Sequence, residues 1–87
     1  MFYLANVESS NYAYRLVSVL KKAGLSAIEV VSTPHGISKA GCNYSLKLSE
    51  KIVISDLLDK ASDMKKGIKA IYRAEKTPNG IKYTKIW

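Results

Sequence analysis

The residues best suited to chemistry lie in one short polar stretch that holds the only cysteine and the only histidine of the chain, Cys42 and His35. A cysteine thiol acts as a nucleophile only in its thiolate form, and a free thiol is only a few per cent ionised at pH 7. Lys39, His35 or the backbone amides beside Gly41 could favour the anion, although their spacing alone does not place them. In the opposite interpretation Cys42 is buried and inert, because a free cysteine also packs as a small hydrophobe.

Other kinds of reactive site lack the residues they need. One histidine without a G-x-S-x-G elbow gives no basis for a serine triad, and Gly36 and Gly41 lack the spacing of a phosphate-binding loop. A zinc site takes three or four ligands, whereas one chain offers a single cysteine and a single histidine. The sequence therefore predicts neither a metal nor a cofactor.

The first half of the chain predicts a strand, a helix and a second strand. Phe2–Val7 is apolar and rich in strand formers, and the Glu8-Ser9-Ser10 cluster that follows is typical of a helix N-terminus. From Asn11 to Lys22 apolar residues recur at spacings of three and four, and Gly24 supplies a left-handed end. Ser26–Thr33 is β-branched and stops at Pro34.

The second half predicts a strand, a helix and a hairpin. Asn43–Leu48 alternates, with Tyr44, Leu46 and Leu48 on a buried face and Asn43, Ser45 and Lys47 on a wet one. A helix follows, starting near either Ser49 or Ser55 and closing at Gly67. Ile68–Glu75 and Ile81–Trp87 then flank the turn Pro78-Asn79-Gly80, which is a strong hairpin signal.

This order of elements favours one α+β domain spanning residues 1–87. Two helices cannot cover both faces of so small a sheet, so both are expected on one face. The simplest architecture is a ferredoxin-like βαββαβ plait with a C-terminal β-hairpin extension, in which the other sheet face stays open to water, a partner or a second copy.

The stretch from Ser32 to Leu48, S-T-P-H-G-I-S-K-A-G-C-N-Y-S-L-K-L, resembles the centre of the selenium/sulfur carrier protein-like family of short bacterial domains. The family pattern is Thr-Pro-Arg-x-(Leu/Ile)-Ser, a few small residues, Cys-Gly and an apolar strand. The positions that match are Thr33, Pro34, Ile37, Ser38, Cys42, Leu46, Lys47 and Leu48. His35 stands where arginine is frequent, Asn43 replaces the glycine after the cysteine, and the loop is one residue longer.

The resemblance implies that the protein carries sulfur or selenium on Cys42, as a carrier or transfer protein rather than an enzyme with a full catalytic apparatus. Its partners would then be a protein donor and a protein acceptor of the chalcogen. The residues expected to support the thiol are Thr33, Pro34, His35, Ser38, Lys39 and Gly41.

The alternative is a binding or oligomerisation module in which Cys42 is structural. The net charge of +7 would suit an acidic partner or RNA, although lysines at helix ends also account for it. Tyr3 and Tyr44 could stack bases from neighbouring strands, but the signature run of RNA-recognition modules is missing, which argues against nucleic acid. A homodimer would use the open sheet face or the terminal hairpin with Trp87.

The composition also indicates the cellular compartment. A single cysteine forms no internal disulfide, which favours a reducing cytoplasm. The N-terminal stretch lacks the pattern of a secretion signal, and no apolar run approaches the roughly 20 residues that a membrane span needs.

Overall fold

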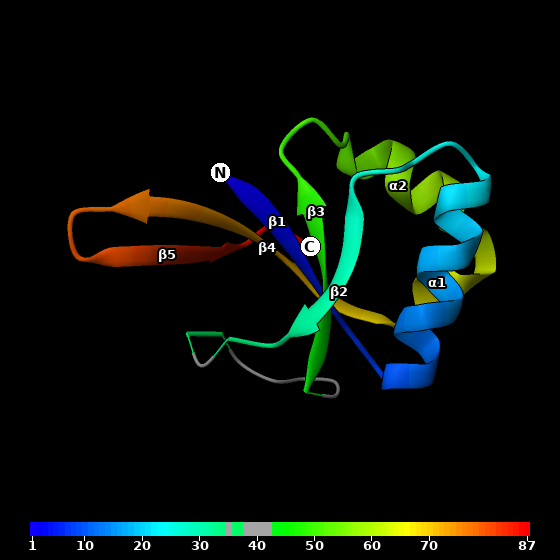
Figure 1. Cartoon of the computed structure of the whole chain (residues 1–87), viewed down its shortest axis with the longest axis horizontal. Helices are drawn as coiled ribbons and strands as arrows, with labels where there is room; N and C mark the ends of the chain where they lie inside the picture. Colours follow the sequence, from blue (N-terminus) through cyan, green and yellow to red (C-terminus); the bar gives the residue numbers. More distant parts are fainter. Residues whose placement is uncertain (35, 38–42) are drawn as a thin grey trace.

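The strands and helices follow one another along the chain largely as the hydrophobic periodicity of the sequence predicts. The computed structural model describes residues 1–34, 36–37 and 43–87. In chain order its elements are β1 (Phe2–Val7), α1 (Ser10–Lys22), β2 (Ile28–Ser32), β3 (Tyr44–Ser49), α2 (Ile54–Ala61), the 3-10 helix η1 (Ser62–Gly67), β4 (Ile68–Thr77) and β5 (Gly80–Lys85) (Figure 1). The predicted α+β class is confirmed.

The five strands form one antiparallel sheet in the order β2-β3-β1-β4-β5. The chain joins β1 to β2 through α1, yet β3 lies between these two strands. It joins β3 to β4 through α2 and η1, yet β1 lies between them. Because of these two interleaved crossovers, the ends of strands far apart in the sequence lie side by side.

Both α-helices pack on one face of the sheet, as predicted (Figure 1). One core cluster joins the helices to that face, with Ala5, Val7, Leu46, Leu48 and Ile71 from the sheet and Ala13, Leu16, Leu20, Leu57 and Ala61 from the helices. Burying a leucine side chain stabilises a fold by about 1.5–3 kcal/mol. This single layer of leucines and alanines therefore fixes the helices and leaves the opposite sheet face to other contacts.

The ends of α1 follow the sequence signals closely. The Ser9 hydroxyl accepts a hydrogen bond from the Tyr12 backbone N–H at 3.1 Å, which satisfies one of the donors that a helix start leaves unpaired. Gly24 has a φ of +100°, a conformation that glycine adopts without strain. The predicted start and end of this helix are confirmed.

The second helical segment differs from its prediction. It begins at Ile54, beside Ser55 rather than Ser49, and it ends at Ala61 instead of running on to Gly67. Ser62 has a φ of +54°, and the chain continues as 3-10 turns. Met64 still packs against the core cluster after this break in the helix. The apolar spacing therefore could not reveal the change.

The alternation predicted for β3 is only partly right. Leu46 and Leu48 are buried against the helices, as expected. Tyr44, predicted to point inward, is 41% exposed and lies outside the core cluster. Ser45, predicted on a wet face, is fully buried. Something other than the helices must therefore cover the opposite face at Ser45.

The C-terminal hairpin forms as predicted, with Pro78 and Asn79 between its strands. Gly80 has a φ of +123°, which explains why a glycine ends the turn. β4 pairs with β1 only as far as Ala74, whereas its pairing with β5 continues to Thr77. The tip of the hairpin therefore projects beyond the rest of the sheet (Figure 1).

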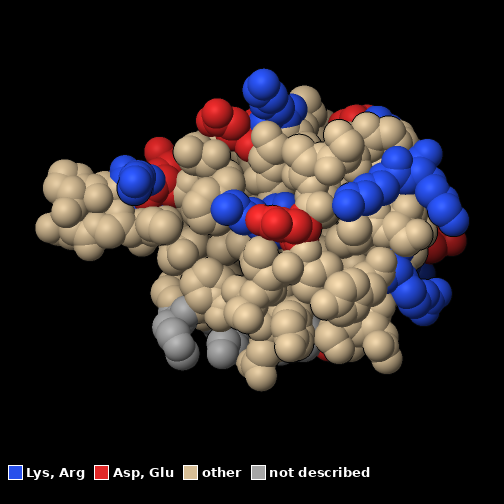
Figure 2. Space-filling view, viewed as in Figure 1, with Lys and Arg blue, Asp and Glu red and all other residues tan. Residues whose placement is uncertain are grey.

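Lysines lie at helix ends, as expected from the charge pattern. Lys21 and Lys22 occupy the last turn of α1, and Lys65 and Lys66 the last turn of η1. Cations there are favoured by the negative end of the helix dipole. On the face drawn in Figure 2, basic side chains gather over α1.

Gly67 marks a close contact between η1 and α1. A Cβ atom at Gly67 would overlap the ring of Tyr12, so no larger residue fits without movement. The Gly67 carbonyl also accepts a hydrogen bond from the Glu8 backbone N–H at 3.0 Å. The start of β4 is thereby fixed against the start of α1.

We expect Gly67→Ala to lower the free energy of unfolding by about 1–3 kcal/mol, because the added methyl group overpacks this contact. Urea denaturation measures the effect. In a Tyr12→Ala background the ring is gone and the same change should cost less. An equal cost in both backgrounds would contradict the contact.

Stability should also depend on the ionisation of Tyr12. Burial raises the pKa of Tyr12 above its ordinary value of 10.0, and Glu8 adds to the shift. The Gly67 backbone and Arg15 oppose this rise in the pKa only in part. Because the unfolded chain loses this proton first, the free energy of unfolding should fall as the pH rises above about 10. Tyr12→Phe should reduce that fall, and parallel pH profiles for the two proteins would refute the assignment.

Candidate functional site

The predicted site falls partly outside the described residues. His35, Ser38, Lys39, Gly41 and Cys42 all lie there, so a reactive Cys42 stays a prediction. Thr33 and Pro34 are described, as are Gly36, Ile37 and Asn43. The site can therefore be built from the residues that hold the two ends and the middle of segment 34–42, the segment that carries the cysteine.

Backbone pairing closes the two ends of this segment. The β2–β3 ladder runs to the pair Ser32 and Tyr44, and beyond it the Thr33 N–H donates to the Asn43 carbonyl at 2.7 Å. Cys42 directly precedes Asn43 in the sequence. The predicted nucleophile is thus bonded to a residue whose position the sheet fixes.

Three buried polar side chains reinforce this closure, and together they are called the loop-base cluster: Asn6 on β1, Thr33 just after β2, and Ser45 on β3. The Thr33 and Ser45 hydroxyl oxygens are 2.8 Å apart, and either can donate. The Asn6 side-chain amide donates to both oxygens, each at 3.3 Å. Asn6 and Ser45 are fully buried and Thr33 is 7% exposed. Both ends of segment 34–42 are thereby tied to the central strand of the sheet.

The loop-base cluster mainly favours one relative arrangement of its three side chains and adds little net stability. A hydrogen bond inside a protein adds only about 0.5–1.5 kcal/mol, whereas a buried polar group left without a partner costs about 1–3 kcal/mol. Any shift of Thr33 relative to Ser45 would therefore be penalised. The cluster also explains why Ser45 is buried on the face that its alternation assigned to water.

Sequence reasoning missed Asn6. Its signal was present, because Asn6 is a polar residue within the otherwise apolar strand Phe2–Val7. On β1 it shares a face with Phe2 and Leu4, opposite the helices, while Ala5 and Val7 join the core cluster. A polar residue inside a strand of this kind is normally paired, and here its partners come from β3 and the end of β2.

The middle of segment 34–42 is also in contact with the sheet. Ile37 is 7% exposed and packs with Ala70, Tyr72 and Tyr83 in a second apolar cluster. The sheet face opposite the helices is therefore partly covered by the chain itself. The expectation that this face stays open is wrong at this position, because the predicted loop carries an apolar residue that packs back onto β4.

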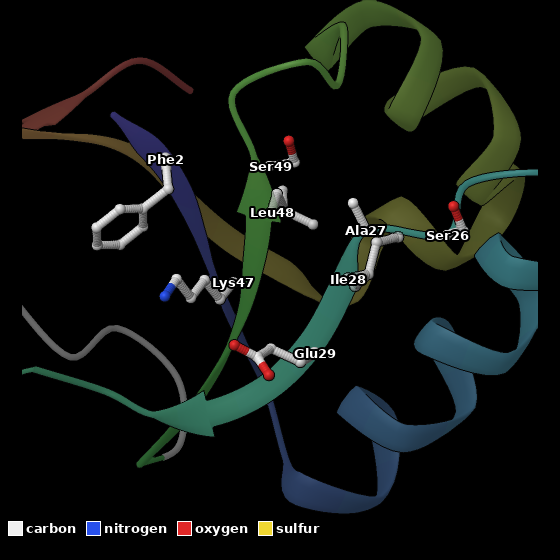
Figure 3. Close-up of a pocket in the computed structure, with 8 residues that line it drawn as sticks. All are labelled: Phe2, Ser26, Ala27, Ile28, Glu29, Lys47, Leu48 and Ser49. Atoms are coloured by element: carbon white, nitrogen blue, oxygen red, sulfur yellow. The ribbon is translucent and has the colours of Figure 1, made fainter.

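A shallow pocket of about 380 Å³ lies at the other end of β3. Figure 3 shows Phe2, Glu29 and Lys47 pointing to the same side of the sheet there. The Lys47 ammonium sits 4.9 Å from the centre of the Phe2 ring, and Lys47 pairs in register with Glu29. This mixture of one ring and two opposite charges suits weak contact with an amphipathic group. The pocket includes Lys47 and Leu48, two positions that match the family pattern, but it lies at the opposite end of β3 from Asn43.

The described residues give no sign of a metal centre, and the two tyrosines considered for base stacking lie apart. Within ranges 1–34, 36–37 and 43–87, no three histidine, cysteine, aspartate or glutamate residues form a group that could hold a metal ion. Tyr3 pairs with Leu48 and packs against the core cluster, at the opposite end of β3 from Tyr44. The two tyrosines therefore do not form one platform.

Comparison with known proteins decides the family. Residues 2–73 match the family model described as "Putative Se/S carrier protein-like". The chain belongs to this family. No curated protein and no solved structure matches it significantly.

The carrier-like match includes β1, both α-helices, segment 34–42 and the first part of β4. The loop-base cluster thus lies wholly within the carrier-like region. Residues 74–87, with the hairpin tip and β5, lie outside it. No helix in the described part of this carrier-like chain has the length and apolar character to span a membrane.

We expect Ser45→Ala to lower the free energy of unfolding by about 1–2 kcal/mol, because it removes the two buried hydrogen bonds that the Ser45 hydroxyl makes with Asn6 and Thr33. Ser32→Ala is the matched control, since Ser32 lies on β2 beside Thr33 but is exposed. Urea denaturation of both variants tests the cluster. Similar small effects for the two serines would contradict it.

Proposed function

We propose that this protein carries sulfur or selenium on Cys42, as a persulfide or perselenide, between a donor protein and an acceptor protein. The observation that carries the proposal is membership of the carrier-like family in a chain whose only cysteine lies within the matched region. Such a role needs one accessible thiol and a docking surface. It needs no metal, cofactor or complete set of catalytic residues.

The transfer itself is a thiol exchange. The Cys42 thiolate attacks the outer sulfur of a persulfide, R–S–SH, on the donor protein. The S–S bond of the donor breaks, a new S–S bond forms on Cys42, and the donor cysteine leaves as a thiolate. The proton stays on the transferred sulfur and no external oxidant is needed. Selenium transfer follows the same scheme with R–S–SeH.

We assign supporting roles to the residues that lie near Cys42 in the sequence. Thr33 ties the start of segment 34–42 to the sheet, and the ring of Pro34 fixes its own φ. We assign His35, Ser38, Lys39 and Gly41 to stabilising the thiolate and its persulfide. The net charge of +7 would steer the carrier toward acidic surfaces on its partners.

The fold assigned in this proposal is a ferredoxin-like plait with one added strand. Two interleaved crossovers, the inner order β3-β1 and a single helical layer support this assignment. β5 then extends the plait at the β4 edge. A fold name does not establish a function, so the activity rests on the family and on Cys42.

Incubation with a cysteine desulfurase and cysteine should add one sulfur atom to the wild-type protein, and dithiothreitol should remove it. Mass spectrometry of the intact protein measures both changes. Cys42→Ser is the matched control and should gain nothing. If the wild type stays unmodified under conditions that load a known sulfur carrier, the proposal is wrong and Cys42 belongs to a binding module instead.

A further inference from the structure

Tyr83 on β5 contacts the middle of the segment that carries Cys42. A Cβ atom at Gly36 would lie 2.8 Å from two carbons of the Tyr83 ring, Cδ2 and Cε2, so the ring lies directly on the Gly36 backbone. The neighbouring Ile37 is buried in a cluster with Ala70, Tyr72 and Tyr83. These contacts involve only described residues.

The contact spans the sheet. β2, from which the segment starts, is one edge strand, and β5, which holds Tyr83, is the other. Within a few residues of Ser32 the chain therefore crosses the face opposite the helices. In Figure 1 the chain just after β2 and the β4–β5 hairpin both lie away from the helices. Tyr83 is opposite Ala74 in the ladder, which places it on the same face as Ala70 and Tyr72.

Tyr83 lies outside the region that matches the family, whereas Gly36 and Ile37 lie inside it. The family region alone supplies the loop-base cluster, which fixes the two ends of segment 34–42. The added strand supplies a third point of attachment at Gly36 and Ile37.

We propose that Tyr83 is a positioning residue for sulfur transfer to Cys42: its ring holds the Gly36–Ile37 backbone, so that this part of the surface is ordered before a partner protein docks. The inference rests on the proposed carrier function. Its physical basis is that a surface ordered before docking loses less conformational entropy on docking. A small reagent that needs only access to the sulfur gains little from such order.

Three variants and one control separate an effect of the Tyr83 ring on docking from an effect on the reactivity of the thiol. Tyr83→Ala removes the ring, Tyr83→Phe keeps it, and Gly36→Ala pushes it away from the backbone. Ile81→Ala is the control, because Ile81 shares β5 with Tyr83 but is 45% exposed and absent from the second apolar cluster. Circular dichroism confirms that each variant is folded before it is used.

Two measurements test the contact between Tyr83 and the Gly36–Ile37 backbone and its effect on sulfur loading. Amide hydrogen exchange at Ile37 reports whether the backbone is held, and Tyr83→Ala should accelerate it by about tenfold or more. The second readout is the rate of sulfur loading by a cysteine desulfurase divided by the rate of alkylation by iodoacetamide. This ratio corrects for any change in the intrinsic reactivity of the thiol. It should fall about fivefold in Tyr83→Ala and in Gly36→Ala, and stay near wild type in Tyr83→Phe and Ile81→Ala.

The possible results distinguish three claims: that Tyr83 holds the segment, that this contact aids docking, and that the protein is a carrier. Unchanged exchange at Ile37 in Tyr83→Ala would show that the ring is not an anchor. Faster exchange with an unchanged ratio would show an anchor without a role in presentation, which overturns the inference but leaves the carrier function standing. If the wild type is not loaded at all, the carrier function fails and the presentation role fails with it, while the exchange data still decide whether Tyr83 holds the segment.

Discussion

The hydrogen-bonded closure between Thr33 and Ser45 is the constraint on which the candidate site depends. Its backbone bond joins Thr33 to Asn43, and its side-chain bonds recruit Asn6 from the central strand. Because these groups are buried, a conformation that separates them would leave polar atoms without water or partners. The ends of the segment that carries Cys42 are therefore fixed by a penalty for opening rather than by a large favourable energy.

The sheet topology makes this closure possible. β1 lies between β3 and β4, so Asn6 can face both the start of β3 and the end of β2 without any loop reaching across the molecule. The helices occupy the other face and hold β1 and β3 together through an apolar layer. One face of the sheet thus provides stability, and the other is available to support a functional segment.

The C-terminal strand changes what that second face does. In a sheet that ended with β4, Ile37 would meet Ala70 and Tyr72 but would lack the ring of Tyr83. β5 adds this ring while its own edge stays unpaired and carries lysines, which discourage pairing with another sheet. The extension therefore adds a local contact and an outer strand that carries lysines together with Ile81, which is 45% exposed.

Sequence by itself determined the features that depend on near neighbours. The period of α1, its Ser9 cap, the hairpin turn at Gly80 and the choice of Cys42 as the one candidate nucleophile all follow from short windows or from counting. It failed at Ser62, where the helix breaks although Met64, two residues later, still packs against the core. It failed again at Ser45, because alternation separates two faces of a strand but does not say what covers each of them. Only the tertiary structure decided that Asn6 and Ser45 are buried together and that Tyr83 meets Gly36, since those contacts join residues far apart in the chain and no local pattern records which distant segment will arrive.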